Sequence, residues 1–247
     1  MYIVKIGGSV ITEKSRYRKM RENVISRLAD EFIPEDSILI HGAGSFGHYI
    51  ADKFNLNDGL GDSNRIEYAR VALDLQELNS AIIRALIERE KPAITIPVHS
   101  FHMVGEEFPY RRFKDYMERG IVPVTYGDVV LDPRKGMGIC SGDQIAFHLS
   151  KALRPDKVIF VTDVDGIYDR NPKIYGDAKL LGEVSGKEKL NFSGTVPDVT
   201  GSMEGKLRVM RAIAKLGIEV MVINGLVRGR LRRAMRGEDV KGTRVLA

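Results

Sequence analysis

Short apolar runs alternate along this chain with longer segments in which apolar residues recur every three or four positions. The short runs predict buried strands, at residues 2–6, 37–41, 93–98, 121–125, 157–162, 218–223 and 243–246. The periodic segments predict amphipathic helices, at about 20–32, 65–90, 111–119, 144–153, 205–216 and 226–236. Strands that alternate with helices indicate an α/β fold, with a largely parallel sheet covered on both faces. Ligands of such sheets bind beyond the carboxyl ends of the strands, so a shared site is predicted there.

The composition is that of an ordinary globular protein. Of its 247 residues, 43% are hydrophobic and 29% are charged, which is enough apolar material for a sizeable core. No stretch approaches the roughly 18 unbroken apolar residues of a membrane-spanning helix, and Lys5 follows the start too closely for a signal peptide. The single cysteine, Cys140, cannot form an internal disulfide, which favours a reducing compartment. We expect a cytoplasmic protein with one domain over residues 1–247.

The charge balance narrows the choice of ligand without deciding it. The chain carries 38 Lys and Arg residues against 33 Asp and Glu residues, a formal charge of +5, which suits nucleic acid, anionic lipid or small phosphorylated ligands. Its 25 glycines favour the small phosphorylated ligand, because backbone amides at glycine turns bind anions. The arginines between residues 228 and 236 lack interleaved aromatic residues, so we interpret them as a solvated face. Neither nucleic acid nor a membrane is expected as a partner.

Two glycine-rich turns follow predicted strands near the N-terminus. Lys5-Ile6-Gly7-Gly8-Ser9 could bring backbone N–H groups and a fixed cation to a phosphate, although a Gly-Gly pair alone is more often a tight turn. It matches neither G-x-x-x-x-G-K-[ST] nor G-x-G-x-x-G. The second turn, His41-Gly42-Ala43-Gly44-Ser45-Phe46-Gly47-His48, combines three glycines with a histidine that could donate a hydrogen bond to an oxyanion. The histidines at 99, 102 and 148 have no comparable context and are interpreted as structural.

Three further features lie in the second half of the chain. Residues 163–166, Asp-Val-Asp-Gly, follow a predicted strand, and an EF-hand is excluded because its twelfth position is Ile174. A strand-end turn that contacts a nucleotide is the better interpretation. Lys206 stands at the start of a predicted helix, where a cation is unfavourable unless an anion binds beside it. Asp143, also in a first helical turn, could pair with such lysines and hold them in place.

Taken in this order, these segments resemble the amino acid kinase family, from Lys5 to the terminal residues 242–245. The narrower resemblance is to the archaeal-type members that phosphorylate isopentenyl phosphate. It rests on residues 5–12 with Lys14, on residues 41–48, on Tyr126-Gly127-Asp128, on Ser141-Gly142-Asp143 and on residues 162–168, and His48 is the most diagnostic position. The chain departs from the motif at Ala43, where glycine is frequent, and alanine fits there unless a positive φ is required. A second departure is the run 200–206, which ends at Lys206, because the spacing from this run to the lysine varies in the family.

The resemblance implies an open αβα sandwich, with the acceptor side in residues 1–140 and the nucleotide side in residues 141–247. It implies transfer of the γ-phosphoryl group of ATP to isopentenyl phosphate, giving isopentenyl diphosphate, a late step of an alternative mevalonate route. It also implies Mg2+ bound mainly through the ATP phosphates, without dedicated protein ligands, and a homodimer. Other phosphate acceptors, fosfomycin or a nucleoside monophosphate, stay open. A non-catalytic nucleotide sensor or RNA-binding regulator is disfavoured, because such a protein has no need of Lys5 and Lys206 to hold a γ-phosphoryl group.

Site residues carried over from the resemblance fall into three groups. Catalysis is assigned to Lys5, Lys14, His48, Asp143 and Lys206. ATP binding is assigned to Lys5, Ile6, Gly7, Gly8, Ser9, Gly44, Asp163, Asp165, Gly166, Tyr168, Gly201, Gly205 and Lys206, with the amides of Gly7, Gly8, Ser9 and Gly44 around the phosphates. Acceptor binding is assigned to Ala43, Gly44, His48, Tyr68, Val71, Gly127, Ile139 and Gly142. Tyr68, Val71, Ala72 and Leu75 are expected as one wall around the prenyl tail, with Ile139 opposite, although core packing explains these residues equally well.

Overall fold

One sheet positions the rest of the molecule. The computed structural model describes residues 1–185 and 203–247, and within them eight strands form a sheet in the order β3-β4-β2-β1-β7-β9-β10-β8. The strands are β1 (Tyr2–Ile6), β2 (Ser37–His41), β3 (Ala93–Thr95), β4 (Val122–Tyr126), β7 (Lys157–Thr162), β8 (Glu183–Val184), β9 (Glu219–Asn224) and β10 (Gly242–Val245). Neighbouring strands are parallel except β9 and β10. Because β1 pairs with both β2 and β7, the two halves of the chain share this sheet.

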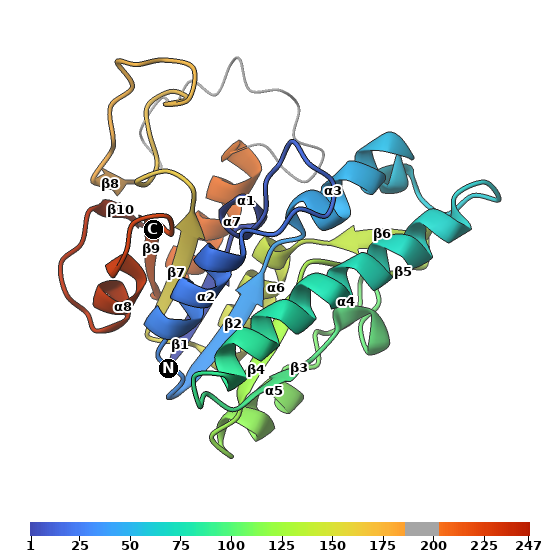
Figure 1. The fold of residues 1–247 in the computed structure, drawn as a ribbon, viewed down its shortest axis with the longest axis horizontal. Coiled ribbons are helices and arrows are strands. Elements are labelled where there is room, and N and C mark those ends of the chain that lie inside the picture. The colour runs from blue at the N-terminus through green and yellow to red at the C-terminus, as the bar shows by residue number, and fades with distance from the viewer. Residues whose placement is uncertain (186–202) are drawn as a thin grey trace.

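Helices cover both faces of the sheet (Figure 1). Successive residues of a strand point to opposite faces, so Val4 and Ile6 of β1 pack into one core and Ile3 packs into the other. The first core includes α2 (Glu22–Glu31), α3 (Gly44–Lys53), α4 (Arg65–Ile87) and α8 (Arg230–Met235), and the second includes α5 (Arg111–Met117), α6 (Gly142–Leu153) and α7 (Met203–Ala214). The predicted αβα sandwich with a mostly parallel sheet is confirmed.

Two differences from the predicted elements matter for the site. β3 ends at Thr95 instead of continuing to residue 98, because Pro97 has no N–H to donate and the chain turns into a short 3-10 helix at Val98–Ser100. A hairpin of β5 (Asp128–Asp132) and β6 (Gly136–Cys140) lies where no strand is predicted. Its turn closes at Gly136, which has φ 77°. This hairpin brings side chains beside the cleft described next.

Candidate active site

The carboxyl ends of parallel strands meet at one edge of the sheet. Ile6 at the end of β1 lies opposite His41 of β2, which lies opposite Tyr126 of β4. A cleft of about 550 Å³ opens at this edge. Of the residues assigned a role from the sequence, those that line it are Lys5, Gly7, Gly8, Ser9, Lys14, Ala43, His48, Val71, Gly127, Ile139, Gly142, Asp143, Asp163, Gly166, Tyr168 and Lys206. Turns and helix starts from both halves of the chain therefore face one cavity.

Some assigned residues do not line this cleft. They are Ile6, Gly44, Tyr68, Asp165 and Gly205 among the described residues. Gly201 lies outside the described residues. Ile6 is 4% exposed and packs into the core under α2, because its side chain alternates with that of Lys5. A contact of Ile6 with ATP could therefore come only from its backbone.

Two glycine turns support the cleft by touching each other. A Cβ atom on Gly8 would overlap the backbone of Gly44, so only glycine lets the turn after β1 approach the turn after β2 this closely. Gly44 has φ 52°, and a Cβ atom there would overlap the Thr12 hydroxyl. Ala43 has φ −65° and ψ −32°, which alanine adopts without strain. The positive φ of this turn falls on Gly44, so alanine fits at position 43.

Lys5 and Asp143 form an ion pair at the cleft. The Lys5 Nζ lies 2.7 Å from Asp143 Oδ1, and the two side chains are 10% and 8% exposed. Asp143 is fixed because α6 starts with a capping box, in which the Ser141 hydroxyl accepts from the Gln144 amide and the Gln144 side chain accepts from the Ser141 amide. The ion pair places the Lys5 ammonium group at a defined point of the cleft.

The turn after β1 supplies backbone N–H groups. The helix α1 (Gly8–Ile11) begins directly after this turn, and first-turn amides have no acceptor within their own helix. Gly8 and Ser9 occupy that first turn. The Gly7 amide instead donates to the Val161 carbonyl at 2.7 Å and extends the pairing of β1 with β7. Its predicted place among the phosphate-binding amides is therefore corrected, because the sheet already uses this donor.

Three side chains that can donate to an anion reach the cleft from different elements. His48 lies in the second turn of α3, and Lys206 lies in the first turn of α7. Lys14 lies on the segment 12–20, the dark-blue connection between α1 and α2 in Figure 1. All three line the cleft together with Lys5. Since α3 and α7 cover opposite faces of the sheet, the cleft collects these donors from both layers.

Part of the cleft lining is apolar. One such part, hereafter the apolar part, comes from α3, α4 and the β5–β6 hairpin and consists of Gly47, Ala51, Val71, Leu75, Val129 and Ile139. Tyr68 is not part of this lining. It is 2% exposed, and its hydroxyl donates to the Leu56 carbonyl at 2.5 Å. The predicted tail contact of Tyr68 is therefore corrected. Of the other predicted wall residues on α4, Leu75 lines the cleft one turn beyond Val71, and Ala72 does not.

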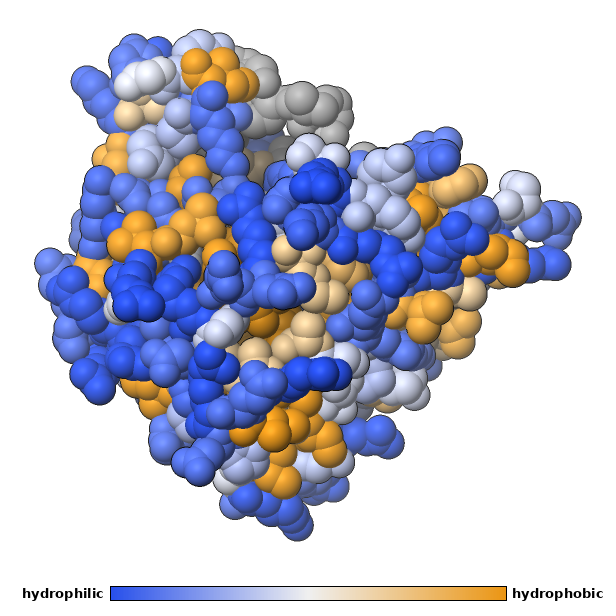
Figure 2. Space-filling model, viewed as in Figure 1, coloured by the Kyte–Doolittle hydropathy of each residue, from blue (hydrophilic) through white to orange (hydrophobic). Residues whose placement is uncertain are grey.

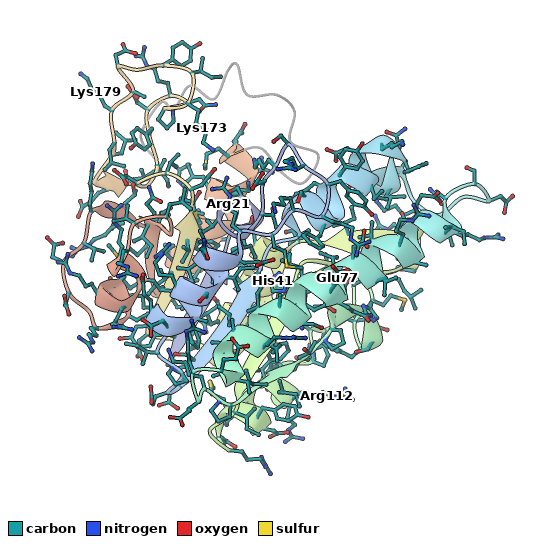
Figure 3. The ribbon with its side chains drawn as sticks, in the orientation of Figure 1. Arg21, His41, Glu77, Arg112, Lys173 and Lys179 are labelled. Carbon is teal, nitrogen blue, oxygen red and sulfur yellow. The ribbon has the colours of Figure 1, made fainter. Side chains whose placement is uncertain are left out.

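The turn after β7 uses its two aspartates differently. Asp163 lines the cleft, accepts a hydrogen bond from Ser9 and pairs with Lys173, which is labelled in Figure 3. Burial alone would raise the pKa of Asp163, but these donors outweigh burial and lower the pKa below its usual value. The Asp165 carboxylate pairs instead with Arg230 at 2.7 Å and with Lys241 at 2.8 Å. This carboxylate joins the turn to the start of α8, and its contact with ATP stays a prediction.

A second pair beside the cleft, between a buried aspartate and a partly exposed histidine, is absent from the sequence-based assignment. Asp128 lines the cleft with a fully buried carboxylate that accepts from His99 Nδ1 at 2.6 Å. This hydrogen bond raises the pKa of His99, although burial acts in the opposite direction. Burial, with a contribution from the Asp128 charge, raises the pKa of Cys140 to about 12, so this thiol stays protonated at neutral pH. Gly127-Asp128 was visible in the sequence, but nothing around position 99 points to its partner.

Metal ligands are not clustered in the part of the chain that the structure describes. No group of three or more His, Cys, Asp or Glu side chains there could hold a metal ion. At the cleft, Asp143 is paired with Lys5 and Asp163 with Lys173, so these carboxylates already have cationic partners. A divalent cation therefore finds no protein cage among the described residues. None of the described helices combines the length and apolar character needed to cross a membrane.

Comparison with known proteins finds one family along nearly the whole chain. The model of the amino acid kinase family matches residues 1–224. The isopentenyl phosphate kinase of Methanothermobacter thermautotrophicus is 37% identical, over 99% of this chain and 98% of the relative. The isopentenyl phosphate kinase of Thermoplasma acidophilum is also 37% identical, over 91% of this chain and 92% of the relative.

Solved structures share the fold. A crystal structure of an isopentenyl phosphate kinase substrate complex has a TM-score of 0.85 and 34% identity, covering 99% of this chain and 100% of that chain. The product complex of the T. acidophilum isopentenyl phosphate kinase has a TM-score of 0.84 and 34% identity, covering 99% of both chains. A UMP kinase from Ureaplasma parvum, with a TM-score of 0.66 and 15% identity, shares the fold alone.

Proposed function

This chain belongs to the amino acid kinase family, and we propose that it transfers the γ-phosphoryl group of ATP to isopentenyl phosphate, giving isopentenyl diphosphate. The observation that carries the proposal is a single cleft with a cationic part, lined by Lys5 and Lys206, and an apolar part, lined by Val71 and Ile139. A short hydrocarbon with a phosphate at its head fits such a cleft with the phosphate toward the lysines. The similarity to isopentenyl phosphate kinases over nearly the full length supports the same acceptor.

Neutralising two anions is the task that the proposal gives to the lysines. Phosphoryl transfer needs in-line positioning and charge neutralisation more than covalent help from the protein. Lys5 and Lys206 would contact the transferring phosphoryl group, and Lys14 would contact the terminal phosphates of ATP. Asp143 would orient Lys5 and not act as a base. Because Lys5 is nearly buried, water screens its charge little, so its effect on a nearby phosphate is strong.

The acceptor phosphate needs no general base. The second pKa of a phosphate monoester is about 6, so the nucleophile is already ionised near neutral pH. His48 would donate a hydrogen bond to this phosphate, beside the backbone of Gly127 and Gly142. The prenyl tail would lie along Val71 and Ile139, which require no polar partner from it.

The nucleotide would occupy the side of the cleft between the turns after β1 and β7. The amides of Gly8 and Ser9 would bind phosphate oxygens. The Ser9 side chain also hydrogen-bonds to Asp163, which ties the two turns together. Gly166 and Tyr168 line the same side and would contact the rest of the nucleotide.

Magnesium enters the proposal as an ion carried by ATP. Mg²⁺ keeps several water ligands and is commonly bound through substrate phosphates, where it neutralises their charge. The described residues form no acidic cluster that would hold it independently, which is compatible with this arrangement. Chelation with EDTA should abolish turnover, and added MgCl2 should restore it. Full activity in EDTA would remove the ion from the proposal.

A homodimer is also proposed from the family resemblance. Ile66 and Leu73 lie seven residues apart on α4 and are 66% and 64% exposed, so this helix offers apolar side chains to a partner. Figure 2 shows several apolar patches on an otherwise hydrophilic face. Light scattering coupled to size-exclusion chromatography should give about twice the 27.6 kDa mass of one chain. A monomeric mass at assay concentration would contradict the homodimer.

A panel of acceptors tests the function. Purified protein with ATP and Mg²⁺ is offered isopentenyl phosphate, UMP, acetylglutamate or fosfomycin, while ADP release is followed and the product mass is measured. We expect isopentenyl phosphate to give the highest kcat/KM and a product with the mass of isopentenyl diphosphate. Preference for another acceptor would overturn isopentenyl phosphate as the substrate but would leave the assignment of a kinase activity standing. No ADP release with any acceptor would overturn both.

A further inference from the structure

A buried carboxylate on α4 has no part in the chemistry proposed above. Asp74 is 1% exposed, and a carboxylate is unfavourable in such a position unless it is paired and hydrogen-bonded. It lies on α4 between Val71 and Leu75, which line the apolar part of the cleft. The partners that compensate its charge therefore lie close to the site.

Both partners that the structure gives Asp74 come from the segment 12–20. The Tyr17 hydroxyl donates a hydrogen bond to Asp74 Oδ2, and Arg18 Nη1 lies 3.5 Å from Oδ1. Arg18 also pairs with Glu77 on the next part of α4, labelled in Figure 3. Burial and the bond to Asp74 raise the pKa of Tyr17 to about 12, so the hydroxyl stays protonated and remains a donor at neutral pH. The contacts that compensate the buried charge of Asp74 are therefore the same contacts that hold the segment 12–20 on α4.

The segment 12–20 is a closed loop beside α3 (Figure 1). The Glu13 amide donates to the Lys19 carbonyl at 2.9 Å, which brings the two ends of the loop together. The ring of Tyr17 stacks on Tyr49 of α3, with 5.1 Å between the ring centroids. Lys14, between these contacts, lines the cleft. A loop held on α4 by Tyr17 therefore presents Lys14 to the site.

We propose that Asp74 is a positioning residue, which holds the segment 12–20 through Tyr17 and Arg18 so that Lys14 reaches the terminal phosphates of ATP. The proposal rests on the function proposed above and adds the residues that place one of its lysines. The helix α4 then serves both parts of the cleft, because it carries Val71 in the apolar part and also holds the segment 12–20 that carries Lys14. A purely structural role for Asp74 would lower stability without a specific effect on the use of ATP.

Tyr17→Phe is the gentlest test, because the ring and its stacking on Tyr49 remain and the hydroxyl alone is lost. Asp74→Asn removes the charge while keeping the shape of the side chain. We expect each change to lower kcat/KM for ATP by about fivefold or more, the size of one lost buried hydrogen bond. Glu77→Gln is the matched control, since it removes the exposed partner of Arg18, and its effect should stay below about twofold.

A double-mutant cycle with Lys14→Met separates positioning from stability. If the contacts of Asp74 act through Lys14, loss of the Tyr17 hydroxyl has little effect once this lysine is gone. In the Lys14→Met background, Tyr17→Phe should therefore lower kcat/KM for ATP by less than about twofold. Amide exchange over residues 13–19 should be faster in Tyr17→Phe than in the wild type. Equal fold losses in both backgrounds would overturn the proposal. So would an unchanged kcat/KM for ATP in the Tyr17→Phe variant.

Failure of the wider function would give a different pattern. Calorimetry with an unreactive ATP analogue measures nucleotide affinity without an acceptor. It therefore tests the positioning role of Asp74 whichever acceptor the enzyme uses. If the wild type prefers another acceptor, the acceptor assignment falls and the cycle is measured with that compound. If the wild type is active but Lys14→Met changes neither ATP affinity nor turnover, the positioning proposal is overturned. If Asp74→Asn fails to fold, Tyr17→Phe decides.

Discussion

The cationic and apolar parts of the cleft are built by different means. Lys5 in the cationic part is held at 2.7 Å by Asp143, which a capped helix fixes in turn. The apolar part consists of side chains such as Val71, Leu75 and Ile139 from separate elements. A charge acts on a transferring phosphate only from the right position, whereas an apolar wall tolerates changes that conserve its volume. Substitutions in the cationic part should therefore cost rate, and substitutions in the apolar part should change which acceptors fit.

The largest effect is expected for Lys5→Met. Removing a preorganised charge at the reacting phosphate should lower kcat by about 10²–10³-fold, measured by ADP release at saturating substrates. Lys157→Met is a matched control, because Lys157 is also a nearly buried strand lysine, paired with Glu219 at 2.9 Å, but it lies at the start of β7, away from the cleft. A near-normal kcat in folded Lys5→Met would take this lysine out of the chemical step.

His48→Ala should have the next largest effect. A charge-assisted hydrogen bond to the acceptor phosphate contributes about 1.5–3 kcal/mol, which corresponds to at least a tenfold loss in kcat/KM for isopentenyl phosphate. The KM for ATP should change little, since the contact lies on the acceptor side. His148→Ala, in α6 and outside the cleft lining, serves as the control. Full activity of His48→Ala would eliminate the proposed contact.

Val71→Ala should alter selectivity more than rate. Val71 is 3% exposed at the apolar part of the cleft, so its truncation opens space beside the prenyl tail. The ratio of kcat/KM for a longer prenyl phosphate to that for isopentenyl phosphate should rise by about tenfold, the scale of one or two methylene groups. Ile87→Ala, at the exposed end of the same helix, should leave the ratio unchanged. An unaltered preference in Val71→Ala would place the tail elsewhere.

The smallest effect concerns the His99–Asp128 pair, which lies beside the cleft. Because this pair raises the pKa of His99, its stabilising contribution is fully present below about pH 6.5 and is lost as the pH rises through the raised value. The difference in unfolding free energy between the wild type and His99→Gln should therefore be larger near pH 6 than near pH 9. Urea denaturation at both pH values measures it. A difference that grows with pH would contradict the assignment.

The cationic part of the cleft could be predicted from the sequence because its pieces are local. Lys5, Gly8 and Asp143 adjoin strand ends or helix starts, and parallel strands bring such positions to one edge. The positive φ at Gly44 could not be predicted in this way, since the choice between Ala43 and Gly44 depends on the contact with Gly8.

The apolar part was predicted less well because its wall depends on helix phase and on a hairpin. Tyr68 and Val71 belong to one periodic helix, but the sequence does not say which of its buried positions face the cleft. Val129 contributes from a hairpin that the apolar pattern did not predict. The ion pair of Asp165 could not be predicted either, because its partner Arg230 lies 65 residues away in the sequence and is brought near by the fold.

The central claim is that two phosphates meet beside Lys5, and a crystal structure of the protein with isopentenyl phosphate and an unreactive ATP analogue tests it most directly. The account predicts an acceptor oxygen about 3–3.5 Å from the terminal phosphorus, the distance of a reactive complex. Lys5 Nζ should contact the terminal phosphate, His48 the acceptor phosphate, and Val71 the hydrocarbon. Either ligand bound outside this cleft, or a Lys5 side chain turned away from both phosphates, would contradict the account.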